Sequence, residues 1–175
     1  MKIFYFECSL WLPRPRKEVF EFFANALNLG EITPSWLKFR VVTPKPIYMQ
    51  QGTEIEYRLR IRGIPVRWQS KITVWDPPQR FVDEQIRGPY RVWIHEHRFT
   101  EKPRGTLCED SVQYAPMGGA LVNKLLVERD VRKIFAYRSE RLQDFFQEVT
   151  EDKLSARNDG DFVAAPNAPH PAARR

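Results

Sequence analysis

The residues best suited to chemistry lie in one short stretch, Arg91–Phe99, which holds two of the three histidines of the chain. His95 and His97 are separated by one residue, and the alternation of a β-strand places them on one face with Trp93 and Phe99. Near neutral pH an imidazole can anchor a polar head group or exchange a proton with a bound molecule. The stretch indicates a polar site among aromatic rings, although two hydrogen-bonded core histidines fit the same pattern.

A metal ion is a weaker interpretation of this pair. The third histidine, His170, lies near the end of the chain, so a third ligand would have to be a carboxylate such as Glu84, Glu109 or Asp110. The sequence has no CxxC, HExxH or phosphate-binding glycine motif. We therefore expect neither a metal nor a cofactor.

Asp110 and Tyr114 share a face of the next expected strand with Val112. An aspartate beside a histidine would set the imidazole's tautomer, and a tyrosine would polarise a carbonyl, as in aldol-type cyclisation or dehydration. The alternative is that Asp110 pairs with an arginine of a neighbouring strand. His95, His97 and Asp110 are the candidate catalytic residues.

The elements that position these residues follow from the hydrophobic periodicity. Residues 2–10 read as a strand, and a helix of about three turns begins at Pro15. A short helical turn at 29–32 precedes an extended stretch at 36–43. From Gly52 onward apolar and polar residues alternate strictly, which predicts a meander of antiparallel hairpins with strands at 54–62, 66–74, 81–87, 90–99 and 106–114.

The last element is a long helix of about 28 residues. Its apolar series keeps a 4-3-4-3-4 spacing through Val131, Phe135, Arg138, Leu142, Phe145 and Val149. The order of elements predicts an α+β fold with helices on one face of an antiparallel sheet. A helix that lies across such a sheet without filling it leaves a cavity.

Composition bounds the remaining possibilities. The chain has 175 residues, 42% of them hydrophobic, and a net charge of +6. Only Phe162 among the aromatic residues lies beyond residue 150, so we expect one domain over 1–150 and a disordered tail over 151–175. No apolar run is long enough for a membrane span or a signal peptide, which predicts a cytoplasmic protein with two reduced cysteines, Cys8 and Cys108.

Several stretches resemble the SRPBCC superfamily, the helix-grip proteins that include START domains and birch-pollen allergens. They are ITPSWLKF at 32–39, GTEIEYRLRIRGIPVRW at 52–68, WDPPQRFVDEQIRGPYRVWIHEHRF at 75–99, DSVQY at 110–114 and RKIFAYRSERL at 132–142. The nearest likeness is to bacterial polyketide cyclase/dehydrase-like, ligand-binding members. The resemblance implies a curved sheet of about seven strands around the C-terminal helix, with the first and last strands paired.

The leading hypothesis is a protein that binds a hydrophobic or aromatic small molecule, such as a lipid, a quinone or a polyketide-like compound, between sheet and helix. Aromatic and polar side chains suit such a pocket. The expected lining residues are Trp36, Tyr57, Trp68, Trp93, His95, His97 and Tyr114 from the sheet side, with Phe135 and Leu142 from the helix.

Two alternatives remain open. One is a cyclase- or dehydratase-type enzyme in which a cavity histidine acts as general acid or base. The other is an adaptor that engages an anionic surface through the tail or through the basic side chains of two neighbouring strands, Arg58, Arg60, Arg62, Arg67 and Lys71. Acidic residues on the same face argue against nucleic acid, while peripheral membrane contact, a monomer and a homodimer are all compatible with the sequence.

Overall fold

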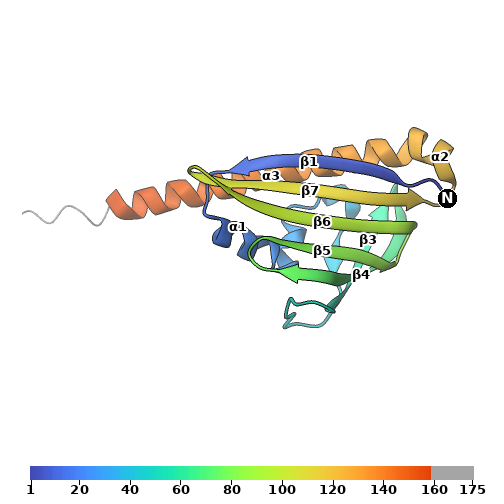
Figure 1. Cartoon of the computed structure of the whole chain (residues 1–175), viewed down its shortest axis with the longest axis horizontal. Coiled ribbons are helices and arrows are strands. Elements are labelled where there is room, and N and C mark those ends of the chain that lie inside the picture. Colours follow the sequence, from blue (N-terminus) through green and yellow to red (C-terminus); the bar gives the residue numbers. More distant parts are fainter. Residues whose placement is uncertain (159–175) are drawn as a thin grey trace, which may run out of the picture.

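The computed structural model describes residues 1–158 and contains one curved, seven-stranded antiparallel sheet packed on a long helix (Figure 1). The strand order is β1-β7-β6-β5-β4-β3-β2, so within residues 1–158 β1 and β7 are the only paired strands that are distant in sequence. The strands are β1 (Phe4–Leu12), β2 (Arg40–Val41), β3 (Glu54–Ile61), β4 (Ile64–Asp76), β5 (Arg80–Arg87), β6 (Tyr90–Lys102) and β7 (Gly105–Pro116). This is the predicted meander closed by the first strand.

Short helical elements follow β1, and a long helical segment ends the described chain. The first group is α1 (Arg16–Phe23), η1 (Ala26–Gly30) and η2 (Ser35–Leu37). The second group is α2 (Gly119–Val122), the π-helical turn η3 (Asn123–Val127) and α3 (Glu128–Asn158). α3 thus continues past residue 150, where we expected the domain to end, and projects beyond the sheet in Figure 1. The rest of the expected tail, 159–175, lies outside the described residues.

Two expectations for the N-terminal region need correction. α1 has eight residues and ends at Phe23, so it is shorter than three turns. The stretch 36–43 is extended only at β2, because Trp36 lies in the helical turn η2. Pro34, with a φ of −56°, starts that turn, and Lys38 ends it with a left-handed φ of 47°. The reversal brings Trp36 over α3, where its ring meets Tyr137 with centroids 5.5 Å apart.

A two-residue hairpin turn between β3 and β4 moves one arginine off the face where we expected it. Arg62 and Gly63 both have positive φ, 51° and 83°, as a type I′ turn requires. Arg62 therefore leaves the alternation of β3. Its guanidinium donates to both carboxylate oxygens of Asp130 on α3, at 2.8 and 3.0 Å. Arg62 links the hairpin to the helix and is not part of a basic outer face.

The inner face of the sheet is apolar apart from one cluster. On β6, His95, His97 and Phe99 are buried, so this strand turns the Trp/His/Phe face toward α3 as expected. β1 pairs with β7, with Cys8 opposite Asp110 and Leu10 opposite Cys108, and both cysteines are free thiols. Burial raises the pKa of both thiols to about 12, so neither is a thiolate nucleophile.

One apolar cluster forms where α1 meets the middle of α3. Leu142 and Phe146 of α3 are 2% and 1% exposed and lie in one cluster with Leu12, Phe20 and Phe22. The aromatic ring of Phe22 meets those of Phe145 and Phe146 at centroid distances of 4.6 and 5.4 Å. This cluster joins the first strand, the first helix and the last helix, and it closes one end of the space under the sheet.

Truncating Leu142 tests this packing. Leu142→Ala should lower the free energy of unfolding by about 2–5 kcal/mol, because it leaves a void among rigid neighbours. The matched control is Gln143→Ala at the adjacent exposed position, which should change it by less than about 0.5 kcal/mol. Urea denaturation followed by circular dichroism measures both. Equal effects of the two substitutions would contradict the packed position of Leu142.

Candidate functional site

A cavity of about 560 Å³ lies between the inner face of the sheet and α3. This volume is within the range of about 300–1,000 Å³ that holds small-molecule ligands. Its wall is mainly aromatic and aliphatic, and η1, η2 and the β3–β4 hairpin border it. Trp36 is 45% exposed and lines the cavity, with the Lys133 ammonium 4.5 Å from its ring centroid.

The expected lining residues divide into two groups. Seven of the nine line the cavity: Trp36, Tyr57, Trp68, Trp93, His95, His97 and Phe135. Tyr114 and Leu142 do not. Tyr114 is 2% exposed and packs against Phe4, Tyr90 and Trp93, while Leu142 belongs to the cluster with α1. The cavity lining therefore gives no support to the carbonyl-polarising role considered for Tyr114.

The polar part of the cavity is made by strand register. Asp83 of β5 lies directly opposite His95 of β6, and His97 of β6 lies directly opposite Asp110 of β7. Side chains opposite each other on neighbouring strands share a face, and their Cβ atoms are about 4.5–5.5 Å apart. Two carboxylates and two imidazoles therefore meet on the concave face, where Phe81 stacks on His97 with centroids 4.2 Å apart.

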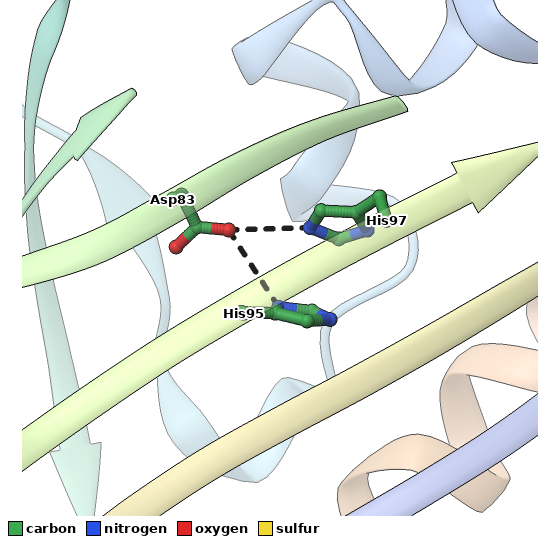
Figure 2. A group of neighbouring side chains, drawn as sticks. All are labelled: Asp83, His95 and His97. Atoms are coloured by element: carbon green, nitrogen blue, oxygen red, sulfur yellow. Dashed lines mark hydrogen bonds and ion pairs between the residues drawn. The ribbon is translucent and has the colours of Figure 1, made fainter. Parts of the chain in front are cut away.

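Each imidazole lies between the two carboxylates. His95 Nε2 is 2.9 Å and His97 Nδ1 is 2.8 Å from the same Asp110 oxygen, Oδ1. On the other side, His97 Nε2 is 3.2 Å and His95 Nδ1 is 3.6 Å from Asp83 Oδ2 (Figure 2). All four ring nitrogens thus face a carboxylate oxygen. The centroids of the two imidazole rings are 3.8 Å apart.

A hydrogen-bond chain from β4 orients Asp83. The Ser70 hydroxyl, 1% exposed, donates to Asp83 Oδ1 at 3.3 Å and accepts from the Trp68 indole N–H at 3.0 Å. Because Oδ1 is held in this way, Oδ2 is left to face both imidazoles.

Arg138 brings a positive charge to the cluster from α3. Its side chain is buried, with Nη2 3.4 Å from His97 Nδ1 and 3.9 Å from Asp110 Oδ1. The guanidinium carbon lies 5.1 Å from the centroid of the Phe23 ring, and Arg138 Nε has no hydrogen-bond partner among the described residues. Arg138 is thus a desolvated cation that lines the cavity.

The electrostatics of the cluster decide its protonation. Burial acts to raise the pKa of Asp110, but the Arg138 charge and the hydrogen bonds from His95 and His97 hold it well below its usual range. The pKa of Asp83 is lowered too, since its hydrogen bond with His97 and the nearby positive charges outweigh burial. Both carboxylates are therefore ionised near neutral pH.

The two histidines differ in basicity. Burial and the charge of His97 lower the pKa of His95 despite its hydrogen bond to Asp110. For His97 burial also acts to lower the pKa, but hydrogen bonds to Asp110 and Asp83 outweigh it and the pKa is raised. When His97 is protonated, one imidazolium, one arginine and two carboxylates sum to zero net charge.

Sequence reasoning found three of the five charged or titratable members of this cluster. Asp110 pairs with His95, which is the arrangement considered for catalysis. Asp110 also has an arginine neighbour, Arg138, but this arginine comes from α3 and not from a neighbouring strand. Asp83 and Arg138 were missed as site residues. Asp83 shares a strand face with buried Phe81, and Arg138 interrupts the apolar series of α3, so both signals were present. Glu84 and Glu109, considered as metal ligands, follow the opposite alternation and do not line the cavity.

The outer face of the sheet retains part of the basic group. Arg58, Arg60 and Arg67 are exposed, while Lys71 pairs with Glu54 at 3.6 Å. These side chains do not line the cavity. Binding of an anionic surface there stays a prediction. Among the described residues, no helix is sufficiently long and apolar to cross a membrane.

Comparison with known proteins agrees with this geometry. The profile of the family "Polyketide cyclase / dehydrase and lipid transport" matches residues 12–146, and the chain belongs to this family. A search of curated proteins gives no match.

Solved structures share the helix-grip fold. The ZhuI aromatase/cyclase from Streptomyces sp. R1128 superposes with a TM-score of 0.67 at 14% identity, covering 83% of this chain and 94% of that one. The major latex-like protein 151 of Panax ginseng gives 0.63 at 10% identity, covering 82% and 97%. A protein of Thermus thermophilus gives 0.56 at 19% identity, covering 79% and 96%. At these identities the likeness concerns the fold.

Removing one carboxylate tests the charge balance. Asp110→Asn should lower the free energy of unfolding by about 3–5 kcal/mol, because it leaves Arg138 and His97 buried with one negative charge fewer. Glu109→Gln is the matched control, since Glu109 is adjacent and turned to the other face, and it should cost less than about 0.5 kcal/mol. Chemical denaturation at neutral pH compares the two variants. If Asp110→Asn changed the free energy of unfolding as little as Glu109→Gln does, the proposed charge balance would be refuted.

Proposed function

We propose that this protein binds one hydrophobic or aromatic small molecule in the cavity between the sheet and α3. The observation that carries the proposal is the cavity itself, about 560 Å³ in volume and walled mainly by aromatic and aliphatic side chains. An ordinary close-packed core has few voids larger than a water molecule. Burial of a ligand's apolar surface there would contribute about 25 cal/mol per Å².

The arrangement of polar groups supports a ligand with one polar end. Trp68 and Trp93 form one part of the wall, with ring centroids 5.2 Å apart, and Tyr57 lies opposite Trp68 on the adjacent strand. The histidine pair and Arg138 supply the cationic and hydrogen-bonding groups. A lipid, quinone or polyketide-like compound has this combination of an apolar body and an oxygen-bearing end.

Filling the cavity tests the proposal. Ile134 of α3 lines the cavity, and Ile134→Trp should lower affinity for an apolar probe about tenfold or more by occupying its space. Ala136→Trp adds the same ring to an exposed position of the same helix and should leave affinity unchanged. Calorimetric titration with menadione, a small naphthoquinone, measures both variants, and native mass spectrometry of the freshly purified protein detects any retained compound. Absence of any bound compound together with no menadione binding would overturn the proposal.

A second candidate is an enzyme of the cyclase or dehydratase type, and the pairing of His95 with Asp110 favours it. A neutral imidazole whose Nε2–H is held by a carboxylate has Nδ1 as its basic nitrogen, and in His95 this atom is 3.6 Å from Asp83 Oδ2, beyond an ordinary hydrogen bond. In this reaction class His95 would remove a proton next to a carbonyl, and Arg138 would stabilise the enolate oxygen.

Incubation with a linear poly-β-keto thioester tests the enzyme directly. The expected product is lighter by one water and absorbs as an aromatic ring. His95→Gln should abolish its formation while menadione binding persists. Undiminished product formation by His95→Gln would remove His95 from the mechanism.

A further inference from the structure

The two histidines and Asp83 form a group that the hydrogen-bonded cluster does not fully satisfy. Asp83 Oδ2 faces His97 Nε2 at 3.2 Å and His95 Nδ1 at 3.6 Å, and Figure 2 shows both rings turned toward this single oxygen. Ligand atoms of the three residues all lie within 4.8 Å of one another. Three donor atoms from two adjacent strands thus lie close to one another on the cavity wall.

The spacing suits a metal ion. A zinc ion binds imidazole nitrogen and carboxylate oxygen at about 2.0–2.2 Å, so two of its ligands at tetrahedral or octahedral angles are about 2.8–3.6 Å apart. The two contacts to Asp83 Oδ2, 3.2 and 3.6 Å, fall in that interval. Hydrogen bonding explains the shorter contact, whereas 3.6 Å is long for a hydrogen bond.

Asp110 presents the histidines in the form that a metal requires. Its Oδ1 takes the Nε2–H of His95 at 2.9 Å and lies 2.8 Å from Nδ1 of His97. The tautomer that a metal needs has these two nitrogens protonated, which leaves the lone pairs of neutral rings on His95 Nδ1 and His97 Nε2, the two atoms that face Asp83. In that tautomer the Nδ1–H of His97 points to Asp110 Oδ1, and Nδ1 lies 3.4 Å from Arg138 Nη2. A carboxylate that holds the far N–H of a ligating histidine is the usual support of a metal site.

The remaining ligand is also held in place. Ser70 donates to Asp83 Oδ1, which orients Oδ2 toward the two imidazoles. Every donor atom of the group therefore has a supporting partner that is itself on the sheet, so the geometry is set by strand register and not by a loop.

We propose that Asp83 Oδ2, His95 Nδ1 and His97 Nε2 bind a divalent first-row transition-metal ion in the cavity. Two imidazoles and one carboxylate suit Zn²⁺ or Fe²⁺, while Mg²⁺ and Ca²⁺ prefer oxygen ligands. All three residues line the cavity, so the ion keeps at least one coordination position open toward it. The ion replaces the proton that otherwise lies between Asp83 and His97.

Charge defines what the open position accepts. A divalent ion with Asp83, Asp110 and Arg138 gives a net charge of +1 in a desolvated site. An anionic oxygen at the open position restores neutrality, which specifies hydroxide, a carboxylate or an enolate. With the ion bound, the lone pairs of both histidines are occupied, so neither acts as a general base.

This inference goes beyond the proposed function and does not depend on it. The probe is the metal alone, so loss of menadione binding and loss of metal binding are separate results. If the protein binds menadione but does not bind Zn²⁺ or Fe²⁺, the proposed function stands and the metal site is refuted. If it binds the metal but not menadione, the metal site stands and the proposed function loses this support.

Calorimetric titration of chelator-treated full-length protein with Zn²⁺, anaerobic Fe²⁺ and Mg²⁺ tests the proposal. We expect one Zn²⁺ or Fe²⁺ per chain, no Mg²⁺ binding and a higher melting temperature with Zn²⁺. Asp83→Asn and His95→Gln should weaken Zn²⁺ binding by about 100-fold or more, and Asp110→Asn by about 10–100-fold. The controls are Glu84→Gln, next to Asp83 and turned away, and His170→Ala, which removes the third histidine; both should retain wild-type affinity.

Nitrogen NMR of the wild-type histidines gives a readout that needs no variant to fold. Zn²⁺ should shift the signals of His95 Nδ1 and His97 Nε2, while Nε2 of His95 and Nδ1 of His97 keep their protons. The proposal is overturned by the absence of stoichiometric Zn²⁺ binding, by equal binding in Asp83→Asn, or by shifts confined to His170.

Discussion

The arrangement around the cavity depends on the cancellation of charge among five buried or partly buried side chains. Asp83 and Asp110 would each cost several kcal/mol if buried alone, so they need positive charge at close range. His97 supplies one from the strand between them, and Arg138 supplies another from α3. Because Arg138 has to reach this cluster, the rotation of α3 about its axis and its position along the sheet are both constrained. The electrostatic requirement therefore links the two layers of the fold.

The same constraint explains why the space under the sheet has two different ends. Beyond Arg138 along α3, Leu142 and Phe146 pack with α1 into an apolar cluster with little exposed surface. Before Arg138, Val131, Ile134 and Phe135 line the cavity. A single helix thus contributes a close-packed core on one side of a buried cation and a cavity wall on the other.

Much of this could be read from the sequence because strand alternation and helical periodicity are strong local signals. They predicted the meander, the long helix and the shared face of His95 and His97. Cross-strand register is not a local signal, and it decides which carboxylate meets which imidazole. Asp83 and Glu84 are adjacent acidic residues; alternation from Phe81 indicates that Asp83 faces inward, and the pairing of Asp83 with His95 shows which imidazole it meets.

Other differences have equally specific causes. Trp36 departs from the extended conformation because Pro34 and left-handed Lys38 enclose it in a turn. Tyr114 lies on the inner face of β7, as strand alternation predicts. The rings of Tyr90 and Trp93 pack against it and separate it from the cavity. Arg138 follows the spacing of the apolar series. Periodicity alone does not distinguish an arginine that is buried with charged partners from one whose guanidinium reaches the solvent.

The pairing of β1 with β7 has a consequence for how the chain is made. Residues that meet across this pair, such as Cys8 and Asp110, are separated by roughly a hundred residues, whereas every other strand pairs with its neighbour in sequence. At a synthesis rate of about 5–20 residues per second, β1 waits about 5–20 s for its partner to emerge from the ribosome. During that interval Phe4, Phe6 and Leu10 have no β7 to pair beside, so β1 stays an unpaired apolar strand for longer than any other strand of the sheet.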